Sequence, residues 1–338
     1  MKKLKLGKVM VFILISAMLF VGCSGEVNQV DNGGQEDIGQ ENIADQVFQI
    51  GISQLAEHPA LDDARLGFED GLKELGVNAE IDYKNAQGDI TNTISIAQKF
   101  AKDERDLIFA IATPAAQGAK QVTSDIPVIF SAVTDPVVAE LVDTMEAPGG
   151  NVTGTSDASP MDRQLQLFKE LDEDIERVGI IFNTSEPNSQ VQVDMAKEIA
   201  EDLKIEIVEV GISTINDIPQ AVDSIIKKVD GIYTITDNMV ASAINVVAEK
   251  AIQQKMITIG AEDAHVKGGV LVTDGISYYE LGKQSARMAK EILVDGKDTK
   301  DIGVEISENT QKAFNINTLK ALELDENHPA FEGATKID

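Results

Sequence analysis

The chain has 338 residues, enough for two domains, and its hydrophobic (43%) and charged (25%) fractions are those of an ordinary soluble protein, not of a collagen, a disordered tail or a multi-span membrane protein. Its 57 acidic and 29 basic residues give a net charge of −28, which argues against nucleic-acid binding because such a field repels phosphates. One Cys and three His exclude an intrachain disulfide and a Cys₂His₂ zinc site, and we expect no metal.

Residues 1–22 are predicted to be an export signal. Four Lys precede the apolar segment Val9–Val21, which is shorter than the ~20 residues of a membrane-spanning helix. The segment ends at Phe20-Val21-Gly22-Cys23-Ser24, which resembles a bacterial lipobox with small residues before the only Cys. This resemblance implies that Cys23 carries a lipid after cleavage just before it, and the alternatives are an ordinary signal peptide or a buried Cys. We therefore expect the protein to be lipid-anchored outside the cell membrane.

Residues 23–46 are predicted to be the lipidated Cys followed by a flexible acidic tether. The stretch from Ser24 to Gln46 is polar and nearly free of large apolar side chains, so it cannot bury enough surface to fold. Chemistry that depends on ATP or NAD is improbable outside the cytoplasm, and neither G-x-x-x-x-G-K-[ST] nor G-x-G-x-x-G occurs in the chain. We therefore expect no cofactor.

From residue 47 onward, short apolar runs alternate with helical patterns. Strands are predicted at 48–52, 80–83, 107–112 and 126–130, and helices at 61–75, at 90–102 and from Thr113-Pro114 onward. The unbroken apolar run LIFAIA at 107–112 is typical of a parallel strand that is covered on both faces. Alternating strands and helices of this kind predict βαβ units.

The second half of the chain repeats the first. Residues 106–113, 126–131 and 48–54 align with 230–237, 256–261 and 178–184, with offsets of 124, 130 and 130. We therefore predict an α/β protein with two similar doubly wound parallel-sheet lobes, rather than one large doubly wound domain. The lobes are predicted at 47–154 and 155–274, and residues 275–338, which begin with a helix at 278–294, are shared between them.

Two such lobes predict a ligand-binding cleft. Ligands of open α/β sheets lie beyond the carboxyl ends of the strands, and facing lobes place two such edges together. Thr113, as a helix cap, and the following amides would suit a carboxylate. Asp237 holds the equivalent place in the second lobe and would suit an ammonium group, with Glu262 and Asp274 as the next candidates. His58, between the first strand and the first helix, is a candidate to lie over a planar ligand. The alternative for His58 is a surface loop position, and for Thr113 and Asp237 a plain helix cap.

The full set of candidate ligand-binding residues lies at these strand ends. It comprises Gln54, His58, Thr113, Pro114, Ala115, Ala116, Gln117, Ser131, Ala132, Asp135, Ser156, Asp157, Asn183, Ser185, Glu186, Asp237, Asn238, Glu262 and Asp274. No G-x-S-x-G elbow is present, and the only Cys is the one expected to carry lipid. We therefore predict no catalytic residues, although paired carboxylates are abundant enough that a hydrolase stays an alternative.

Six segments together resemble the substrate-binding lipoproteins of ABC importers of the tryptophan/tyrosine-binding type, over about residues 47–324. They are GISQ at 51–54 with His58, TPAAQ at 113–117, SAVTDP at 131–136, GGNVTGTSD at 149–157, TDN at 236–238 and YYELG at 278–282. Such proteins often carry Asp before the Tyr-Tyr pair, where this chain has Ser277.

The resemblance implies a type I periplasmic-binding fold with three crossings between the lobes, an aromatic amino acid as ligand, and an ABC permease with its ATPase as partners. A nucleoside- or sugar-binding lipoprotein of the same fold is the alternative. The absence of Trp counts against a sugar, because sugar-binding proteins of this architecture usually stack the ring on aromatic side chains.

Overall fold

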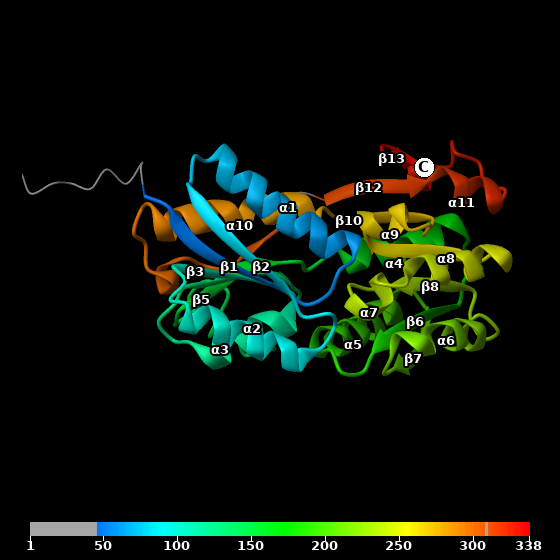
Figure 1. Cartoon of the computed structure of the whole chain (residues 1–338). Helices are drawn as coiled ribbons and strands as arrows, with labels where there is room; N and C mark the ends of the chain where they lie inside the picture. The colour runs from blue at the N-terminus through cyan, green and yellow to red at the C-terminus, as the bar shows by residue number, and fades with distance from the viewer. Residues whose placement is uncertain (1–45, 308–309) are drawn as a thin grey trace, which may run out of the picture. The chain divides into compact units, whose positions relative to one another are not determined.

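The computed structural model describes residues 46–307 and 310–338. The predicted export signal, Cys23 and nearly all of the predicted tether lie outside the described residues. Within the described part, the chain forms two sheets flanked by helices (Figure 1).

The first sheet has the strand order β11-β5-β4-β3-β1-β2, and all its strand pairs are parallel. Its strands are β1 Phe48–Gln54, β2 Ala79–Asn85, β3 Leu107–Ile111, β4 Val128–Val133, β5 Val152–Ser156 and β11 Glu305–Ile306. One face is covered by α1 Pro59–Glu74 and α10 Tyr278–Leu293, and the other by α2 Ile90–Lys102 and α3 Thr113–Val122. The apolar residues of β3 are buried on both faces for this reason.

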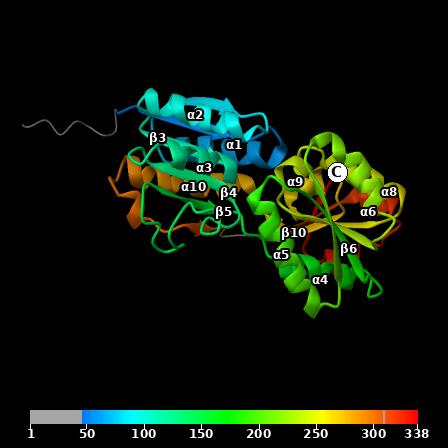
Figure 2. The same cartoon turned by 90° about the horizontal axis from the view of Figure 1, so that it is seen from below.

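The second sheet has the order β13-β12-β10-β9-β8-β6-β7 and is parallel except where β10 meets β12. Its strands are β6 Arg177–Asn183, β7 Glu206–Ile212, β8 Gly231–Thr234, β9 Ile257–Glu262, β10 Val272–Ile276, β12 Thr310–Asn315 and β13 Thr335–Ile337. The helices α4 and α5 lie on one side of it and α6 and α8 on the other (Figure 2). The helices of this half are α4 Met161–Leu171, α5 Pro187–Asp202, α6 Ile218–Ile225, α7 Asn238–Ala241, α8 Ile244–Gln253, α9 Asp263–Lys267 and α11 Ile316–Ala321.

The strand orders confirm the predicted repeat. The order β5-β4-β3-β1-β2 in the first sheet matches β10-β9-β8-β6-β7 in the second, and the three aligned segments become the pairs β3/β8, β4/β9 and β1/β6. The molecule is therefore an α/β protein with two similar doubly wound lobes.

Three crossings join the lobes, as expected, but the predicted lobe boundaries are displaced. The boundary at 154/155 falls inside β5, which belongs to the first sheet, and the boundary at 274/275 falls inside β10, which belongs to the second. The chain crosses after β5, after β10 and between β11 and β12. Because β5 and β10 are completed before the chain leaves their sheets, the first two crossings begin later than predicted. The C-terminal residues are shared: α10 and β11 join the first lobe, and β12, α11 and β13 join the second.

Candidate functional site

The carboxyl ends of the two sheets meet across a cleft, where side chains of the two lobes form hydrogen bonds. His58, which precedes α1, has its Nε2 3.2 Å from Oδ1 of Asn238 at the start of α7. Nearer the hinge, the hydroxyl groups of Thr134 and Thr236 are 3.4 Å apart. These contacts join the two lobes across the cleft.

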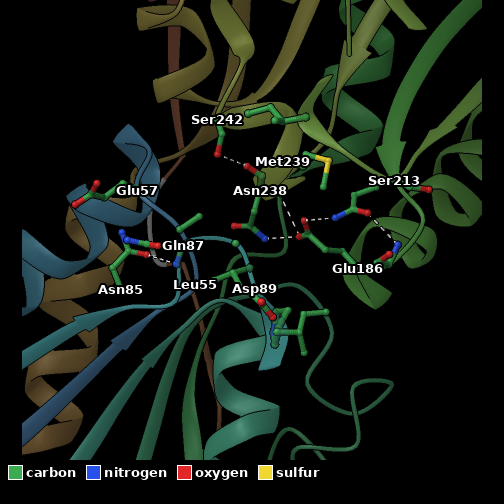
Figure 3. A pocket seen from close by; sticks show the side chains of 17 residues that line it. Leu55, Glu57, Asn85, Gln87, Asp89, Glu186, Ser213, Asn238, Met239 and Ser242 are labelled. Atoms are coloured by element: carbon green, nitrogen blue, oxygen red, sulfur yellow. Dashed lines mark hydrogen bonds between the residues drawn. The ribbon is translucent and has the colours of Figure 1, made fainter. Parts of the chain in front are cut away.

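Two cavities lie along this cleft. The outer pocket has a volume of about 760 Å³ and is lined from the first lobe by segments after β1 and β2 and from the second by segments after β6, β7 and β8 (Figure 3). The inner cavity lies between His58, Asp157, Asn188, Glu262 and their neighbours and has a volume of about 10 Å³, room for at most one water. Asn238 lines both spaces and separates them.

Four polar atoms around the inner cavity are buried and have no hydrogen-bond partner. They are Nδ1 of His58, Oδ1 of Asp157, Oδ1 of Asn188 and Oε2 of Glu262. Unpaired buried polar atoms cost free energy, typically about 1–3 kcal/mol each, and native structures seldom leave them so. These four atoms, which surround one cavity between the two lobes, are available to hydrogen-bond a bound molecule.

Burial shapes the acid–base properties of the cleft. Asp157 accepts a hydrogen bond of 2.6 Å from the Tyr278 hydroxyl on its Oδ2, and burial, with a further contribution from the Glu262 charge, raises the pKa of its carboxyl to about 6. Glu186, which precedes α5, accepts from the side-chain amides of Asn183 and Asn238, and burial next to the Asp237 charge raises its pKa to about 7. Glu262 Oε1 lies 2.9 Å from Nε2 of His265, but the two groups are not aligned for a hydrogen bond.

Asp237, the first candidate for an ammonium partner, already accepts hydrogen bonds on both of its carboxylate oxygens. Its Oδ1 accepts from the Val240 amide at 2.8 Å, which caps α7, and its Oδ2 accepts from the Asn183 amide at 2.6 Å and the Ser189 hydroxyl at 2.7 Å. Its side chain is fully buried, and burial raises the pKa of its carboxyl. Asp237 thus caps α7, and its role as the ammonium partner stays a prediction. Among the carboxylates that line the inner cavity, Asp157 and Glu262 each have an unpaired oxygen.

Backbone strain marks the same edge of the first sheet. Ala112, between β3 and α3, has φ of 84°, and Ala132, in β4, has φ of 58°, values that non-glycine residues seldom adopt. Ala112 is the N-cap position of α3, so Thr113 is not the cap that the sequence suggested but the first helical residue. Its Oγ1 is buried and unpaired, and so is Oε1 of Gln54 at the end of β1. Both residues lie at the carboxyl edge of the first sheet, although neither lines the two cavities.

The structure brings together most of the other predicted residues. Pro114, Asn183, Ser185, Glu186 and Asn238 line the outer pocket. Ala132 lines the inner cavity with His58, Asp157 and Glu262.

Several predicted residues lie elsewhere. Asp274 lines a depression on the second lobe between α4, α5 and β12, and its carboxylate is 3.5 Å from Arg163, so it is not a cleft residue. Asp135 and Ser156 line a smaller pocket beside the first crossing. Ala115 and Ala116 are buried in the core of the first lobe, Gln117 bonds the Ala139 carbonyl, and Ser131 lies inside β4 because that strand begins at Val128, after Pro127, and not at residue 126.

Other cleft residues were not predicted from the sequence. Asn188 lies on the first turn of α5 and Ala241 at the end of α7, both in the inner cavity. Leu55, Ile90 and Met239 supply apolar walls to the outer pocket. A polar residue in the first turn of a helix that follows a strand is a sequence signal that could have found Asn188. The apolar residues of the pocket wall have no such signal in the sequence.

Two lobes with the same strand order, joined by three crossings and facing each other across a cleft, define the type I periplasmic-binding fold. Substrate-binding proteins of 13–19% identity share this fold. Residues 49–336 match the family model described as "ABC transporter substrate binding protein", and the chain belongs to that family. Family membership implies an extracytoplasmic location and an ABC transporter as partner. Within the described residues, no helix has both the length and the apolar character to cross a membrane.

Several relatives share more than 30% sequence identity with this chain. The chain is 42% identical to a "Tyrosine-binding protein" of Clostridioides difficile, over 92% of this chain and 90% of the relative. It superposes on a Streptococcus pneumonia ABC domain in complex with L-Trp with a TM-score of 0.82 at 31% identity, covering 87% and 100% of the two chains. It superposes on the ligand-free, open structure of a Clostridium difficile substrate-binding protein with adhesive properties with a TM-score of 0.67 at 44% identity, covering 86% and 99%.

Proposed function

We propose that this protein captures an aromatic amino acid, tyrosine or tryptophan, outside the cytoplasm and delivers it to an ABC importer. The observation that carries the proposal is the set of unpaired buried polar atoms around the inner cavity, contributed by both lobes. The names of two relatives, a tyrosine-binding protein and a complex with L-Trp, support the ligand class.

Each part of such a ligand has a partner in the cleft. The ammonium group binds the free oxygens of Asp157 and Glu262, and the carboxylate binds the Thr113 hydroxyl at the start of α3. The ring enters the outer pocket, where Leu55, Ile90 and Met239 provide apolar contact. Asn238 and His58 now fill the space between the two cavities, so their side chains move aside when the ligand enters.

A binding screen tests the proposal. The full-length protein, purified in detergent, is screened by thermal shift against the twenty amino acids and the common nucleosides, and hits are measured by calorimetry. Tyrosine or tryptophan should give the largest shift. A nucleoside as the strongest ligand, or turnover of any hit, would replace this function by one of the alternatives.

We further propose that Cys23 is lipidated and anchors the protein to the membrane after residues 1–22 are removed. The basic start, the apolar segment and the solitary Cys after Gly22 support this. Cells that express the Cys23→Ala variant and are fed labelled palmitate should show no labelled protein, and the protein should be released or left uncleaved. A processed, membrane-retained form of that variant would contradict the anchor.

A further inference from the structure

The two cavities of the cleft contain acidic groups without basic ones. Glu57, Asp89 and Glu186 line the outer pocket, and Asp157, Asp237 and Glu262 line the inner cavity. In the described ranges 46–307 and 310–338, no Lys or Arg lines either space. Lys267, which bridges the two lobes, already forms ion pairs. Its Nζ lies 3.1 Å from Oδ2 of Asp63 and 2.9 Å from Oδ2 of Asp263.

The groups that remain for a ligand carboxylate are electrically neutral. The Thr113 hydroxyl is one, but the amides of Ala115 and Ala116 at the same helix start are already bonded to the Ala112 carbonyl at 3.0 and 3.1 Å. A second is the imidazole of His58, whose pKa is lowered by burial, so that it is uncharged at neutral pH. The cleft therefore offers full opposite charges to an ammonium group and only neutral donors to a carboxylate.

We propose that this cleft also binds aromatic primary amines that lack a carboxylate, the decarboxylated counterparts of the amino acids. The inference rests on the proposed function only for the place of the ring. The ammonium group gains charge-assisted hydrogen bonds to Asp157 and Glu262, which are stronger than bonds between neutral groups. An acid that lacks the amine brings a negative charge into a buried cavity lined by three carboxylates and leaves Asp157 and Glu262 unpaired.

Calorimetry with matched ligands tests the inference on the full-length protein in detergent. The probes are tyrosine, tyramine and 3-(4-hydroxyphenyl)propionate, and in parallel tryptophan, tryptamine and 3-indolepropionate. We expect the amine to bind within about tenfold of the amino acid, and the acid about 100-fold or more weaker than the amine. An amine that binds more than about 100-fold weaker than its amino acid, or an acid that binds as tightly as the amine, would overturn the inference.

Variants of single carboxylates test which groups bind the amine. Glu262→Gln and Asp157→Asn keep the side-chain shape and should each weaken tyramine by about 30-fold, consistent with the loss of one charged partner in a desolvated site. Asp125→Asn is the matched control, because Asp125 is exposed just before β4, at the end of the sheet away from the cleft, and lines neither cavity; it should change tyramine affinity less than about threefold. Equal losses in all three variants would show that net charge, not these two groups, holds the amine, and would contradict the assignment.

The two proposals fail in different ways. If an amino acid binds and its amine does not, the inference is wrong and the proposed function stands. If tyramine or tryptamine binds and neither amino acid does, the proposed function is wrong and the inference stands. If none of these ligands binds, both are wrong.

Discussion

The buried carboxylates of the cleft differ in what their oxygens contact. Asp237 is bonded on both oxygens to groups of its own lobe, and Glu186 to the amides of Asn183 and Asn238. Asp157 and Glu262 each retain an unpaired oxygen. Substitutions at these residues should therefore separate into effects on stability and effects on binding.

Asp237→Ala should destabilise the fold. It removes the cap of α7 and leaves the Asn183 amide and the Ser189 hydroxyl without their acceptor, which together should lower the free energy of unfolding by about 1–3 kcal/mol. Denaturant unfolding measures this loss, and calorimetry on the folded protein should show tyrosine affinity within about fivefold of the parent. Unchanged stability with lost binding would restore Asp237 as the ammonium partner.

The stability of the ligand-free protein should fall as the pH rises from about 4 to about 7. The pKa of Asp157 is raised from 3.8 to about 6 and that of Glu186 from 4.5 to about 7, so in this window the folded state holds protons that the unfolded chain has lost. Unfolding then releases protons, and raising the pH favours unfolding.

Thermal unfolding between pH 4.5 and 7.5 measures the effect. Glu186→Gln should flatten the upper part of the slope and Asp157→Asn the lower part, whereas Asp89→Asn, at an exposed side chain, should leave it unchanged. Parent and Glu186→Gln profiles of identical slope would show that Glu186 does not hold its proton in the folded state.

The roles of individual cleft residues could be predicted from the sequence only in part. The positions of Asp157, Glu186 and Glu262 near one cleft follow from the repeat and from the rule for strand ends. The choice between Asp237, Asp157 and Glu262 could not be made from the sequence, because the group that bonds Oδ2 of Asp237 is the amide of Asn183, 54 residues earlier. Contacts of that kind depend on the packed loops and have no local sequence signal.

Among the elements, local signals predicted some boundaries better than others. The helix predicted at 90–102 is α2 with the same bounds, because Asp89 provides its cap through a bond to the Thr91 amide. The start of α3 was misassigned because Ala112, which has no side-chain acceptor, holds the cap position with a positive φ. Only the surrounding packing can enforce such a conformation, and Thr113 was the better cap on propensity alone.

Two glycines permit the close packing of α1 on α10. An added Cβ at Gly67 would lie 1.9 Å from the Tyr279 carbonyl oxygen, and one at Gly282 would lie 2.1 Å from the Ala64 carbonyl oxygen. Both clashes are with backbone atoms, so a side-chain rotation cannot relieve them. The contact also fixes the start of α10, where Tyr278 holds Asp157.

Gly67→Ala should therefore lower the free energy of unfolding by about 1–3 kcal/mol, in spite of the better helix propensity of Ala. Gly150→Ala is the control, because nothing lies within 4 Å of its added Cβ and its φ is not positive. Denaturant unfolding compares the two variants with the parent. A Gly67→Ala protein as stable as the control would mean that the helices separate at little cost.

For the molecule as a whole, the repeat in the sequence predicted two lobes with the same strand order, and the sheets confirm it. It could not predict how far the lobes close, because closure depends on side-chain contacts between segments 100 or more residues apart, such as Thr134 with Thr236. It also could not predict the ion pair of Lys267 with Asp63, which links α9 of the second lobe to α1 of the first.

We expect the lobes to close over the ligand, and the charges of the cleft give the reason. Closing the empty cleft buries Asp157, Glu186, Asp237 and Glu262 with no Lys or Arg lining the cavities of the described chain, and leaves several polar atoms unpaired. The bridge from Lys267 to Asp63 is partly exposed and contributes at most about 1 kcal/mol, too little to offset this. The ligand-free protein in solution should therefore populate a more open arrangement, and an ammonium group that pairs with Asp157 and Glu262 should shift it towards the closed one.

Small-angle scattering of the full-length protein in detergent with contrast-matched micelles, at pH 7.5 with and without saturating tyrosine, measures this shift. The radius of gyration should fall on adding tyrosine, and should fall less at equal concentration in Glu262→Gln, because that variant both binds more weakly and has less charge to compensate. Lowering the pH to about 5 without ligand should also reduce the radius, since protonation of Asp157 and Glu186 removes part of the buried charge. Tight tyrosine binding with an unchanged radius of gyration would mean that the cleft is already closed before the ligand arrives. Other interactions of the folded protein would then offset the free-energy cost of the unpaired carboxylates.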